Sequence, residues 1–475
     1  MKKVVVFNRK RVERVVALTV ALFVMANVLG GCGKKVSDKD EQGRTIISVG
    51  SWPQKEGTAL DRMNARKEAF EKANPDVVVE PDLWTFDIQT FYAKATGGKL
   101  PGIYNTAFTE IPEIINSGYS ADISKVLKKR GYDGKFNKQI LDLVSKDGGV
   151  YSFPYDAYVL GMAYNTELFA AAGLLEEDGT PKQPKDWYEL ADFAVKIKET
   201  TGKPGFLLPT MKNVGGWIFT PIAWSFGVDF MEQNEDGQWK ATFDTPEAVE
   251  ALQYVKDLKW KYDVLPANNL IDGNEMYKVF GVGDAGMMCA AGLIAEYVAQ
   301  YGMEPKQFGI MAYPAGPKRH VTLLGGGLMS INNKYTEDQI DASVRWIETE
   351  YSFNLTDEYK TTLENSIKNS LEAGHLIGVK NMSVWSSDTE TIKYRNELID
   401  KYANINPNQV RLYNEFVEDC PADIQAEEAV CAQELYGILD GCIQEVLANK
   451  DADCAALIKN ANHDLQVNYL DNLTY

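Results

Sequence analysis

The sequence predicts an α/β fold, and three observations indicate it. "TIISVG" at residues 45–50 is a short β-branched run typical of a strand. Residues 58–75 have a helical pattern that stops at Asn74 and Pro75, because a proline disfavours helical conformation in the residue before it. "DVVVEP" at residues 76–81 again has the pattern of a strand. This order predicts a βαβ unit, and hence a parallel pair of strands.

A longer helix is predicted further along the chain, within residues 243–266. Thr245 is its expected N-cap, and Pro246 stands at the first helical position, where a missing N–H costs nothing. Its apolar face is expected to consist of Ala251, Val255, Leu258 and Tyr262. The last third of the chain, as in residues 432–470, also has a mostly helical pattern.

The first residues have the pattern of an export signal. A basic start is followed by the apolar run "VVALTVALFVMANVLGG", of the length typical of a secretory signal. The run ends in Leu29-Gly30-Gly31-Cys32, which resembles the bacterial lipobox. This likeness implies a lipoprotein signal peptide at residues 1–31 and a lipidated Cys32; the alternative is an uncleaved anchor helix. Residues 32–43 continue as a polar stretch, expected to tether a folded body to the membrane.

The composition is strongly acidic. The chain has 67 acidic and 49 basic residues and a formal net charge of -18. Loss of the basic leader would bring the charge to roughly -23. Such a surface repels nucleic acid, so no nucleic-acid partner is expected, and the acidity is interpreted as a means of staying soluble outside the cell.

Several kinds of chemistry find no support in the sequence. The histidines His320, His375 and His463 have spacings that suggest neither a catalytic triad nor a metal site, and GxSxG and HExxH motifs are absent from the sequence. No cofactor or metal is predicted. The rival enzyme hypothesis is a secreted glycosidase with two carboxylates, such as Asp156 and Glu110, across a cleft.

The cysteines beyond Cys32 are odd in number and cannot all pair. Mostly buried free thiols are expected, and the sequence does not reveal any pairing. These cysteines are Cys289, Cys420, Cys431, Cys442 and Cys454.

A series of segments, rather than one motif, resembles a known family. In chain order they are "FEKANPDVVVE", "GGKLPGIYNT", "GVYSFPYDAYVLGMAYNTELFAAAGL", "PKDWYELADFAVKI", "FDTPEAVEALQYVKDL", "VFGVGDAGMMCAAG", "FGIMAYPAGP" and "GGGLMSINNK". With these, the chain from about Arg44 to Tyr475 resembles the extracellular solute-binding proteins of ABC importers, in the sugar-binding branch that includes maltose-binding protein.

The resemblance implies a two-lobed α/β fold with a ligand cleft between the lobes and hinge strands that cross from one lobe to the other. Closure about such a hinge is the functional motion. The implied boundaries are lobe 1 at residues 44–154 and 314–360, lobe 2 at residues 155–313 and 361–475, and hinge crossings near 154–158 and 312–316.

The resemblance also implies ligand contacts. A sugar ring presents a C–H face that packs on an aromatic ring, and hydroxyls that need carboxylate or amide partners. Tyr158 matches a family position that contacts ligand, and Asp156 should share its face of the strand. Trp217, four residues before Pro221, matches a stacking position.

Further candidates follow from position in the implied fold, since open α/β sheets bind ligands at strand ends. The sequence also departs from the family: Gly102 replaces a common acid, and Leu293 and Ile294 stand where many relatives have a stacking tryptophan, so maltose itself is not assumed. The further expected ligand-binding residues are Trp52, Trp84, Thr109, Glu110, Trp224, Gly292 and Trp385.

The function predicted from the resemblance is the membrane-anchored substrate-binding component of an ABC importer. It would bind a sugar, in particular an oligosaccharide, and deliver it to the permease subunits. The protein is expected to be extracytoplasmic, monomeric and without enzymatic activity. Alternative ligands are a polyamine or a peptide.

Overall fold

The structure is a computed structural model and describes residues 38–473. The expected signal peptide and Cys32 lie outside the described residues. Within them, the strands are β1 (Thr45–Val49), β2 (Val77–Pro81), β3 (Ile103–Ala107), β4 (Ser145–Lys146), β5 (Gly149–Val150), β6 (Phe153–Asn165), β7 (Phe206–Leu207), β8 (Met231–Gln233), β9 (Trp239–Ala241), β10 (Met287–Ala291), β11 (Phe308–Met311), β12 (Val321–Ile331) and β13 (Asp423–Ala426).

The helices cover most of the remaining chain. They are α2 (Thr58–Ala73), α3 (Ile88–Thr96), α4 (Ile111–Asn116), α5 (Ser124–Lys129), α6 (Lys138–Leu143), α7 (Thr166–Ala171), α8 (Trp187–Thr201), α9 (Val214–Phe226), α10 (Pro246–Trp260), α11 (Gly273–Gly281), α12 (Ile294–Ala299), α13 (Glu337–Glu348), α14 (Asp357–Glu372), α15 (Glu390–Tyr402), α16 (Pro407–Asp419), α17 (Ala432–Ala448), α18 (Cys454–Asn468) and the 3₁₀ turn η1 (Leu470–Asn472).

A mixed sheet connects the two halves of the molecule. Its strand order is β2-β1-β3-β12-β6-β10-β7, with β11 beside β6 and β13 beside β12. β1 and β2 pair in parallel, with Thr45 opposite Val77, and α2 connects them. The βαβ unit predicted from the sequence is therefore confirmed.

Strand β6 belongs to both halves. Its residues 153–159 pair with β12, whereas residues 160–165 pair with β10 and β11. The last residues of β12, 327–331, pair with β3, and its first residues, 321–324, pair with β13. β6, β12 and β13 thus lie where the two halves meet.

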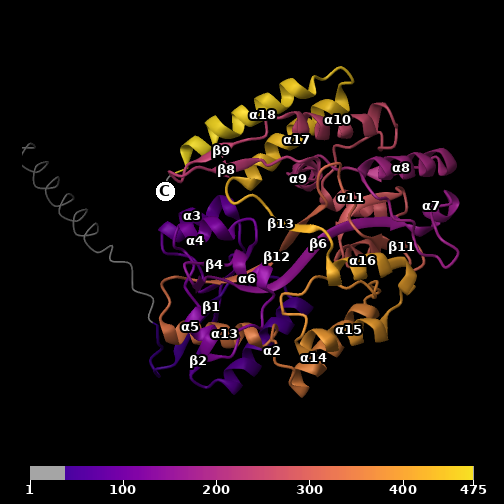
Figure 1. Ribbon diagram of the computed structural model, residues 1–475. Coiled ribbons are helices and arrows are strands. Elements are labelled where there is room, and N and C mark those ends of the chain that lie inside the picture. The colour runs from indigo at the N-terminus through magenta and orange to yellow at the C-terminus, as the bar shows by residue number, and fades with distance from the viewer. Residues whose placement is uncertain (1–37, 474–475) are drawn as a thin grey trace, which may run out of the picture.

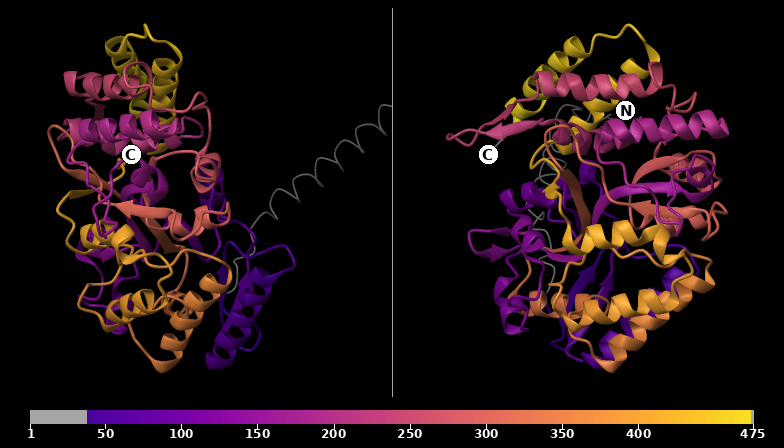
Figure 2. Two further views of the ribbon diagram at one scale, coloured as in Figure 1. Left: turned by 90° about the vertical axis from the view of Figure 1, so that its right-hand side faces the viewer. Right: turned by 45° about the vertical axis from the view of Figure 1, so that its right-hand side comes forward.

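The two halves are separate groups of elements in all three views (Figures 1 and 2). β1, β2, α2, α5, α13 and α14 lie at one end, and α8, α10, α17 and α18 lie at the other. We call the first group, together with β3 and α4, lobe 1, and the second group, together with α9, lobe 2. α14 is counted here with lobe 1, unlike in the boundaries that the resemblance implies. β6 and β12 run between them (Figure 1).

Local sequence signals determine how α10 begins in lobe 2. The Thr245 side chain accepts a hydrogen bond from the Ala248 N–H, and Pro246 is the first helical residue, as predicted. Ala251, Val255 and Leu258 are buried, while Tyr262 lies beyond the end of the helix.

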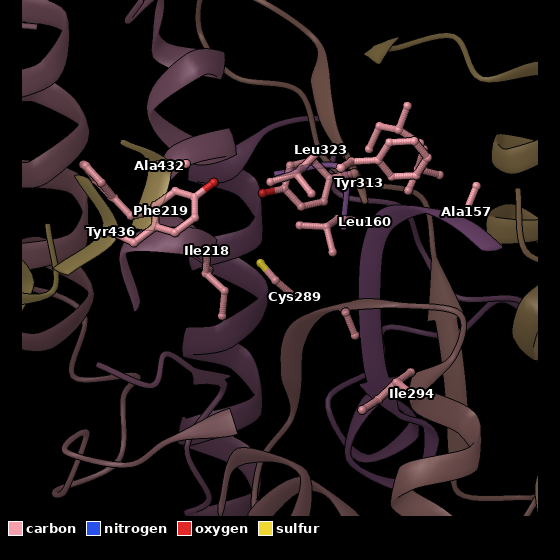
Figure 3. Packing of buried hydrophobic residues seen from close by; sticks show 14 of the residues in the cluster. Ala157, Leu160, Ile218, Phe219, Cys289, Ile294, Tyr313, Leu323, Ala432 and Tyr436 are labelled. Carbon is pink, nitrogen blue, oxygen red and sulfur yellow. The ribbon is translucent and has the colours of Figure 1, made fainter. Parts of the chain in front are cut away.

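The core continues from β6 into the helices of lobe 2. α9 packs along α17, and Ile218, Phe219 and Tyr436 from this pair are among the buried side chains, as are Leu160 of β6 and Leu323 of β12 (Figure 3). A buried aromatic side chain such as Phe219 is worth about 1.5–3 kcal/mol relative to leaving it exposed.

The five cysteines of the described region are free thiols. Cys289, Cys442 and Cys454 are buried, and Cys420 and Cys431 are partly buried. None of the helices in residues 38–473 is both long and apolar enough to cross a bilayer.

Candidate functional site

The middle of β6 lies against three glycines of β12. Tyr158, Ala157 and Asp156 are opposite Gly325, Gly326 and Gly327, respectively. A Cβ atom at Gly325 would lie only 2.3 Å from Cζ of Tyr158, far inside normal contact distance. The absence of a side chain at Gly325 therefore allows the Tyr158 ring to lie close against the crossing strand.

A hydrogen-bonded cluster joins this crossing to both lobes. Thr109, just after β3 of lobe 1, donates a hydrogen bond through its hydroxyl to Oε2 of Glu427. The Tyr436 hydroxyl, on α17 of lobe 2, donates to Oε1 of the same carboxylate at 3.1 Å. Glu427 follows β13 directly. The Trp217 side chain also hydrogen-bonds to this carboxylate and, with the other donors, opposes the effect of burial, which raises the pKa of Glu427.

Glu110 lies beside this cluster. Burial raises its pKa to about 7, and the negative charge of Glu427 adds to this effect, while backbone hydrogen bonds at Glu110 and Ala107 partly offset it. Its Oε2 atom is buried and accepts no hydrogen bond. An unsatisfied buried carboxylate oxygen is costly, so a ligand that offers a donor here gains binding free energy.

Asp156 and Tyr158 are partly buried and close to each other. Burial raises the pKa of Asp156, while the positive charge of Arg395 lowers it. Burial also raises the pKa of Tyr158, and the charges of Glu427 and Asp156 add to the shift. Tyr158 and Asp156, predicted from the sequence, thus lie in one neighbourhood with Glu427.

Two further tyrosines, on α11 and α12, form a stacked pair. Tyr277 of α11 and Tyr297 of α12 stack with ring centroids 5.1 Å apart and an interplanar angle of 17°. Both add to the raised pKa of Tyr158, after burial and the charges of Glu427 and Asp156. Tyr297 is 46% exposed, so part of this pair faces solvent.

Four predicted residues, Thr109, Glu110, Tyr158 and Trp217, come together around Glu427, with Asp156 next to them. Trp84 lies elsewhere on lobe 1. Its partly buried ring packs near Phe86 and Phe91, and the Lys94 ammonium lies 5.5 Å from its centroid.

Three predicted tryptophans are enclosed by protein. Trp52 is 4% exposed and stacks on Trp346. Trp224 is fully buried on α9, and its indole N–H donates to Oε1 of Glu428 at 3.1 Å. Trp385 is 5% exposed and stacks on Phe136, with centroids 4.9 Å apart. Their ring faces are taken up by core packing in this conformation, so we leave them out of the proposed ligand contacts.

Close packing around residue 292 explains why a glycine stands there. Its N–H donates to the Tyr413 hydroxyl at 3.0 Å. A Cβ at this position would lie 2.2 Å from Oδ1 of Asn381. The residue thus supports the turn after β10 and brings no side chain of its own to the site.

Sequence reasoning missed Glu427, Tyr436, Tyr277 and Tyr297. Glu427 and Tyr436 come from the tail, whose path back to the crossing depends on the pairing of β13 with β12, almost a hundred residues apart. The position of Tyr297 in the sequence could have located the tyrosine pair, because it comes three residues after Ile294 and four after Leu293. That is the segment in which many relatives, by the resemblance, carry a stacking tryptophan.

Other surface features lie apart from this cluster. A hollow of about 250 Å³ on lobe 1 is lined by ion-pairing side chains such as Lys129, Asp341 and Arg345. Among residues 38–473, no three His, Cys, Asp or Glu side chains are grouped so that they could hold a metal ion.

Fold and site together define a two-lobed binding protein whose polar and aromatic cluster lies at the junction of the lobes. The chain belongs to the family of bacterial extracellular solute-binding proteins, whose model matches residues 51–349. This assignment confirms the family predicted from the sequence.

Curated relatives align with part of the chain. YcjN of Escherichia coli (strain K12), named as an ABC transporter periplasmic-binding protein, is 27% identical over 304 residues, which cover 61% of this chain and 65% of the relative. The sn-glycerol-3-phosphate-binding periplasmic protein UgpB of Salmonella paratyphi A is 23% identical over 312 residues, covering 62% and 68%. The chain thus aligns with a little under two thirds of the length of the first relatives that it matches.

Solved structures show the fold along nearly the whole chain. The cyclic alpha-maltosyl-1,6-maltose binding protein from Arthrobacter globiformis has a TM-score of 0.66 and 23% identity, covering 91% of this chain and all of that one. The predicted fold class, α/β with two lobes, an interlobe cleft and hinge strands, is therefore confirmed.

Proposed function

We propose that the protein is the substrate-binding component of an ABC importer and captures a sugar, in particular an oligosaccharide, between its lobes. The observation that carries the proposal is the cluster at the lobe junction. Trp217 and Tyr158 offer aromatic surface there, and Glu110 and Glu427 offer carboxylate oxygens. A sugar needs this combination of an apolar face and strong hydrogen-bond acceptors.

The fold and the relatives support the same proposal. The structural neighbours include proteins whose titles name maltose and a cyclic maltosyl-maltose as ligands. YcjN and UgpB are both named as periplasmic binding proteins, and YcjN as one of an ABC transporter. Their names place them outside the cytoplasm, and we infer the same for this chain, with a monomer as its working form.

Capture works by differential affinity in this proposal. Thr109 and Glu110 belong to lobe 1, while Trp217 and Tyr436 belong to lobe 2, and Glu427 lies between them. A ligand that contacts both sets binds the closed form more tightly than the open form, so binding shifts the population towards closure. The closed form then docks on the permease. Ligand binding and release involve no covalent step.

Attachment to the membrane is the part of the proposal that relies on the leader. A lipid on Cys32 would add about 0.8 kcal/mol of membrane affinity per buried methylene, and residues 33–43 would hold the body near the permease. Metabolic labelling of the full chain with a radioactive fatty acid, compared with Cys32→Ala, tests this directly. Equal labelling of both proteins would contradict lipidation at Cys32.

A thermal-shift screen tests the ligand class. Because residues 38–473 form the folded body, protein lacking residues 1–32 is screened against mono- and oligosaccharides, with polyamines and peptides as the alternative classes. A ligand at one hundred times its Kd adds about 2.7 kcal/mol of stability. For a chain of this size that is a shift of roughly 3 °C in Tm.

Trp217→Ala should abolish the shift given by the best carbohydrate. Trp260→Ala is the matched control. Trp260 is 38% exposed, and its indole N–H donates a hydrogen bond to the Val446 carbonyl near the C-terminal end of α17. A shift with peptides or polyamines alone would refute the carbohydrate assignment. Hydrolysis of the carbohydrate during the assay would favour the glycosidase alternative.

A further inference from the structure

We propose that Asp440 of α17 positions Trp217 for ligand binding by holding the first turn of α9 in place. This role rests on the proposed function, because Trp217 is a ligand contact only there. Asp440 acts through the backbone of the helix that carries Trp217, so it is a positioning residue and not a ligand contact.

Helix α9 begins without a cap from its own N-terminal residues. The first N–H groups of a helix have no partner inside the helix. Asn213, the N-cap residue, makes no capping hydrogen bond with its side chain. Asp440 supplies acceptors instead: its Oδ2 accepts from the Asn213 N–H at 2.8 Å, and its Oδ1 accepts from the Gly216 N–H at 2.7 Å. The cap of α9 therefore comes from a residue 227 positions after Asn213.

The carboxylate of Asp440 is buried where it meets these donors. The residue is 6% exposed. Burial raises the pKa of Asp440, while backbone hydrogen bonds at Gly216, Asn213 and Gly215 lower it. A negative charge is stabilised at the start of a helix, because the helix dipole is positive there. Charge-assisted bonds of this kind are strong, so they hold the first turn of α9 firmly against α17.

Trp217 lies within the turn that Asp440 holds. It directly follows Gly216, and its own N–H donates to the Asn213 carbonyl at 2.9 Å. Both of these neighbours are bonded to Asp440. The Trp217 side chain in turn hydrogen-bonds to Glu427. A displacement of this turn would therefore move the indole relative to Glu427.

Tyr436 belongs to the same helix contact. It precedes Asp440 by four residues on α17, so the two side chains lie on one face of that helix. A Cβ at Gly216 would lie 2.2 Å from the Tyr436 carbonyl oxygen, so the backbones of α9 and α17 are in direct contact here. Asp440 thus fixes Trp217 relative to Tyr436, the other lobe 2 donor to Glu427.

The turn before α9 is strained, and α17 holds it. Lys212 and Asn213 have φ angles of 58° and 68°, in the left-handed region that residues with a Cβ rarely adopt. The Nδ2 of Asn213 donates to the Gln433 carbonyl and to the Gln433 Oε1, both at 3.1 Å. Strain of this kind persists only where the surroundings over-determine the backbone. Loss of a bond to Asp440 should therefore let the turn relax and carry Trp217 with it.

Fluorine NMR measures the position of Trp217 without any ligand. Protein lacking residues 1–32 is labelled with 5-fluorotryptophan, and the Trp217 resonance is the one missing from Trp217→Phe. Asp440→Asn keeps the size of the side chain and loses one of its two acceptor oxygens, so this resonance should shift by more than its line width. Trp224, buried two turns further along α9 and identified in the same way, is the internal reference and should not shift. A cap that only stabilises the fold would lower the melting temperature and leave both resonances in place.

Two further variants separate positioning from general stabilisation. Asp453→Asn is the matched control, because Asp453 also caps a helix of lobe 2 and accepts hydrogen bonds from two N–H groups in the first turn of α18. It should leave the Trp217 resonance in place. Gln433→Ala removes one acceptor from the Asn213 side chain and should shift the Trp217 resonance by less than Asp440→Asn does. Melting curves establish which variants are folded, and Gln433→Ala gives the decision if Asp440→Asn does not fold.

Calorimetric titration measures the consequence for binding. The probes are maltotetraose and cellotetraose, which join the same sugar ring through α- and β-linkages. Because the groups of a binding site must be held to within about 0.5 Å, Asp440→Asn should bind the preferred tetrasaccharide at least about tenfold more weakly than the wild type does. Asp453→Asn should bind it as the wild type does.

A Trp217 resonance that stays in place in folded Asp440→Asn overturns the positioning role. An equal shift in Asp453→Asn overturns it too, because the loss of any cap in lobe 2 would then move the indole. Unchanged tetrasaccharide affinity in Asp440→Asn also overturns it. Failure of the wild type to bind either tetrasaccharide would count against carbohydrate capture and not against Asp440, and the Trp217 resonance alone then decides whether Asp440 positions this side chain.

Discussion

Glu428 is a partly buried carboxylate next to Glu427 in the chain, and its replacement by glutamine tests the electrostatics of this region. Burial raises its pKa to about 7 from the ordinary 4.5, against a hydrogen bond from Trp224 that lowers it. The charge of Asp229 adds to the rise. The folded protein therefore holds this proton more tightly than the unfolded chain.

The size of the effect follows from the shift. Each pKa unit is worth 1.36 kcal/mol, so a shift of this size corresponds to about 3 kcal/mol. For an acid whose pKa is raised by folding, the stability is fully present below pH 4.5 and is lost as the pH rises through 7. Glu428→Gln mimics the protonated form at every pH and can still accept the hydrogen bond from the Trp224 indole.

Urea unfolding at pH 5 and pH 8 measures the difference. The variant should exceed the wild type in free energy of unfolding by about 3 kcal/mol at pH 8 and by less than about 1 kcal/mol at pH 5. Glu418→Gln removes an exposed carboxylate and should show no such trend. A variant that is less stable than the wild type at pH 8, or a difference that does not change with pH, would refute this description.

Three other substitutions test the packing around the crossing strands. In Gly325→Ala, the new Cβ would lie 2.3 Å from Cζ of Tyr158, so the ring must move by about 1 Å. The variant should bind the screened ligand at least tenfold more weakly and lose about 1–3 kcal/mol of stability. Unchanged affinity in a calorimetric titration would show that Tyr158 does not contact ligand. Gly441→Ala should instead stabilise the protein by up to about 1 kcal/mol and raise the midpoint of urea unfolding, because alanine favours the helix. The new Cβ has no other atom within 4 Å. A lower midpoint would mean that the alanine side chain does not fit there. Tyr413→Phe removes the hydroxyl that accepts a hydrogen bond from the Gly292 N–H and donates one to the Val159 carbonyl. Because both backbone groups stay buried, urea unfolding should show a loss of about 1–3 kcal/mol in stability. A loss below about 0.5 kcal/mol would mean that other partners replace the hydroxyl.

Local patterns were enough to predict much of the fold. The strand, helix and strand of residues 45–81 and the cap of α10 at Thr245 depend on residues within a few positions of each other, and the structure has them as predicted. The order of segments along the chain gave the family, which the family model confirms.

The candidate site was less accessible, because partners far apart in sequence decide the fate of each aromatic residue. Trp52 was expected at the cleft from its place after a strand, but Trp346, nearly three hundred residues later, covers its ring. Trp385 packs against Phe136 of lobe 1 in the same way. Glu427 has no local signal, since only the pairing of β13 with β12 brings it to Thr109.

A solute that binds between the two lobes should close them. Small-angle scattering of protein lacking residues 1–32 tests it most directly, with and without a saturating amount of the carbohydrate that gives the largest thermal shift. The radius of gyration should be smaller with the carbohydrate, and should not change in Trp217→Ala at the same concentration. A carbohydrate that binds the wild-type protein at saturation without changing its radius of gyration would contradict capture by closure.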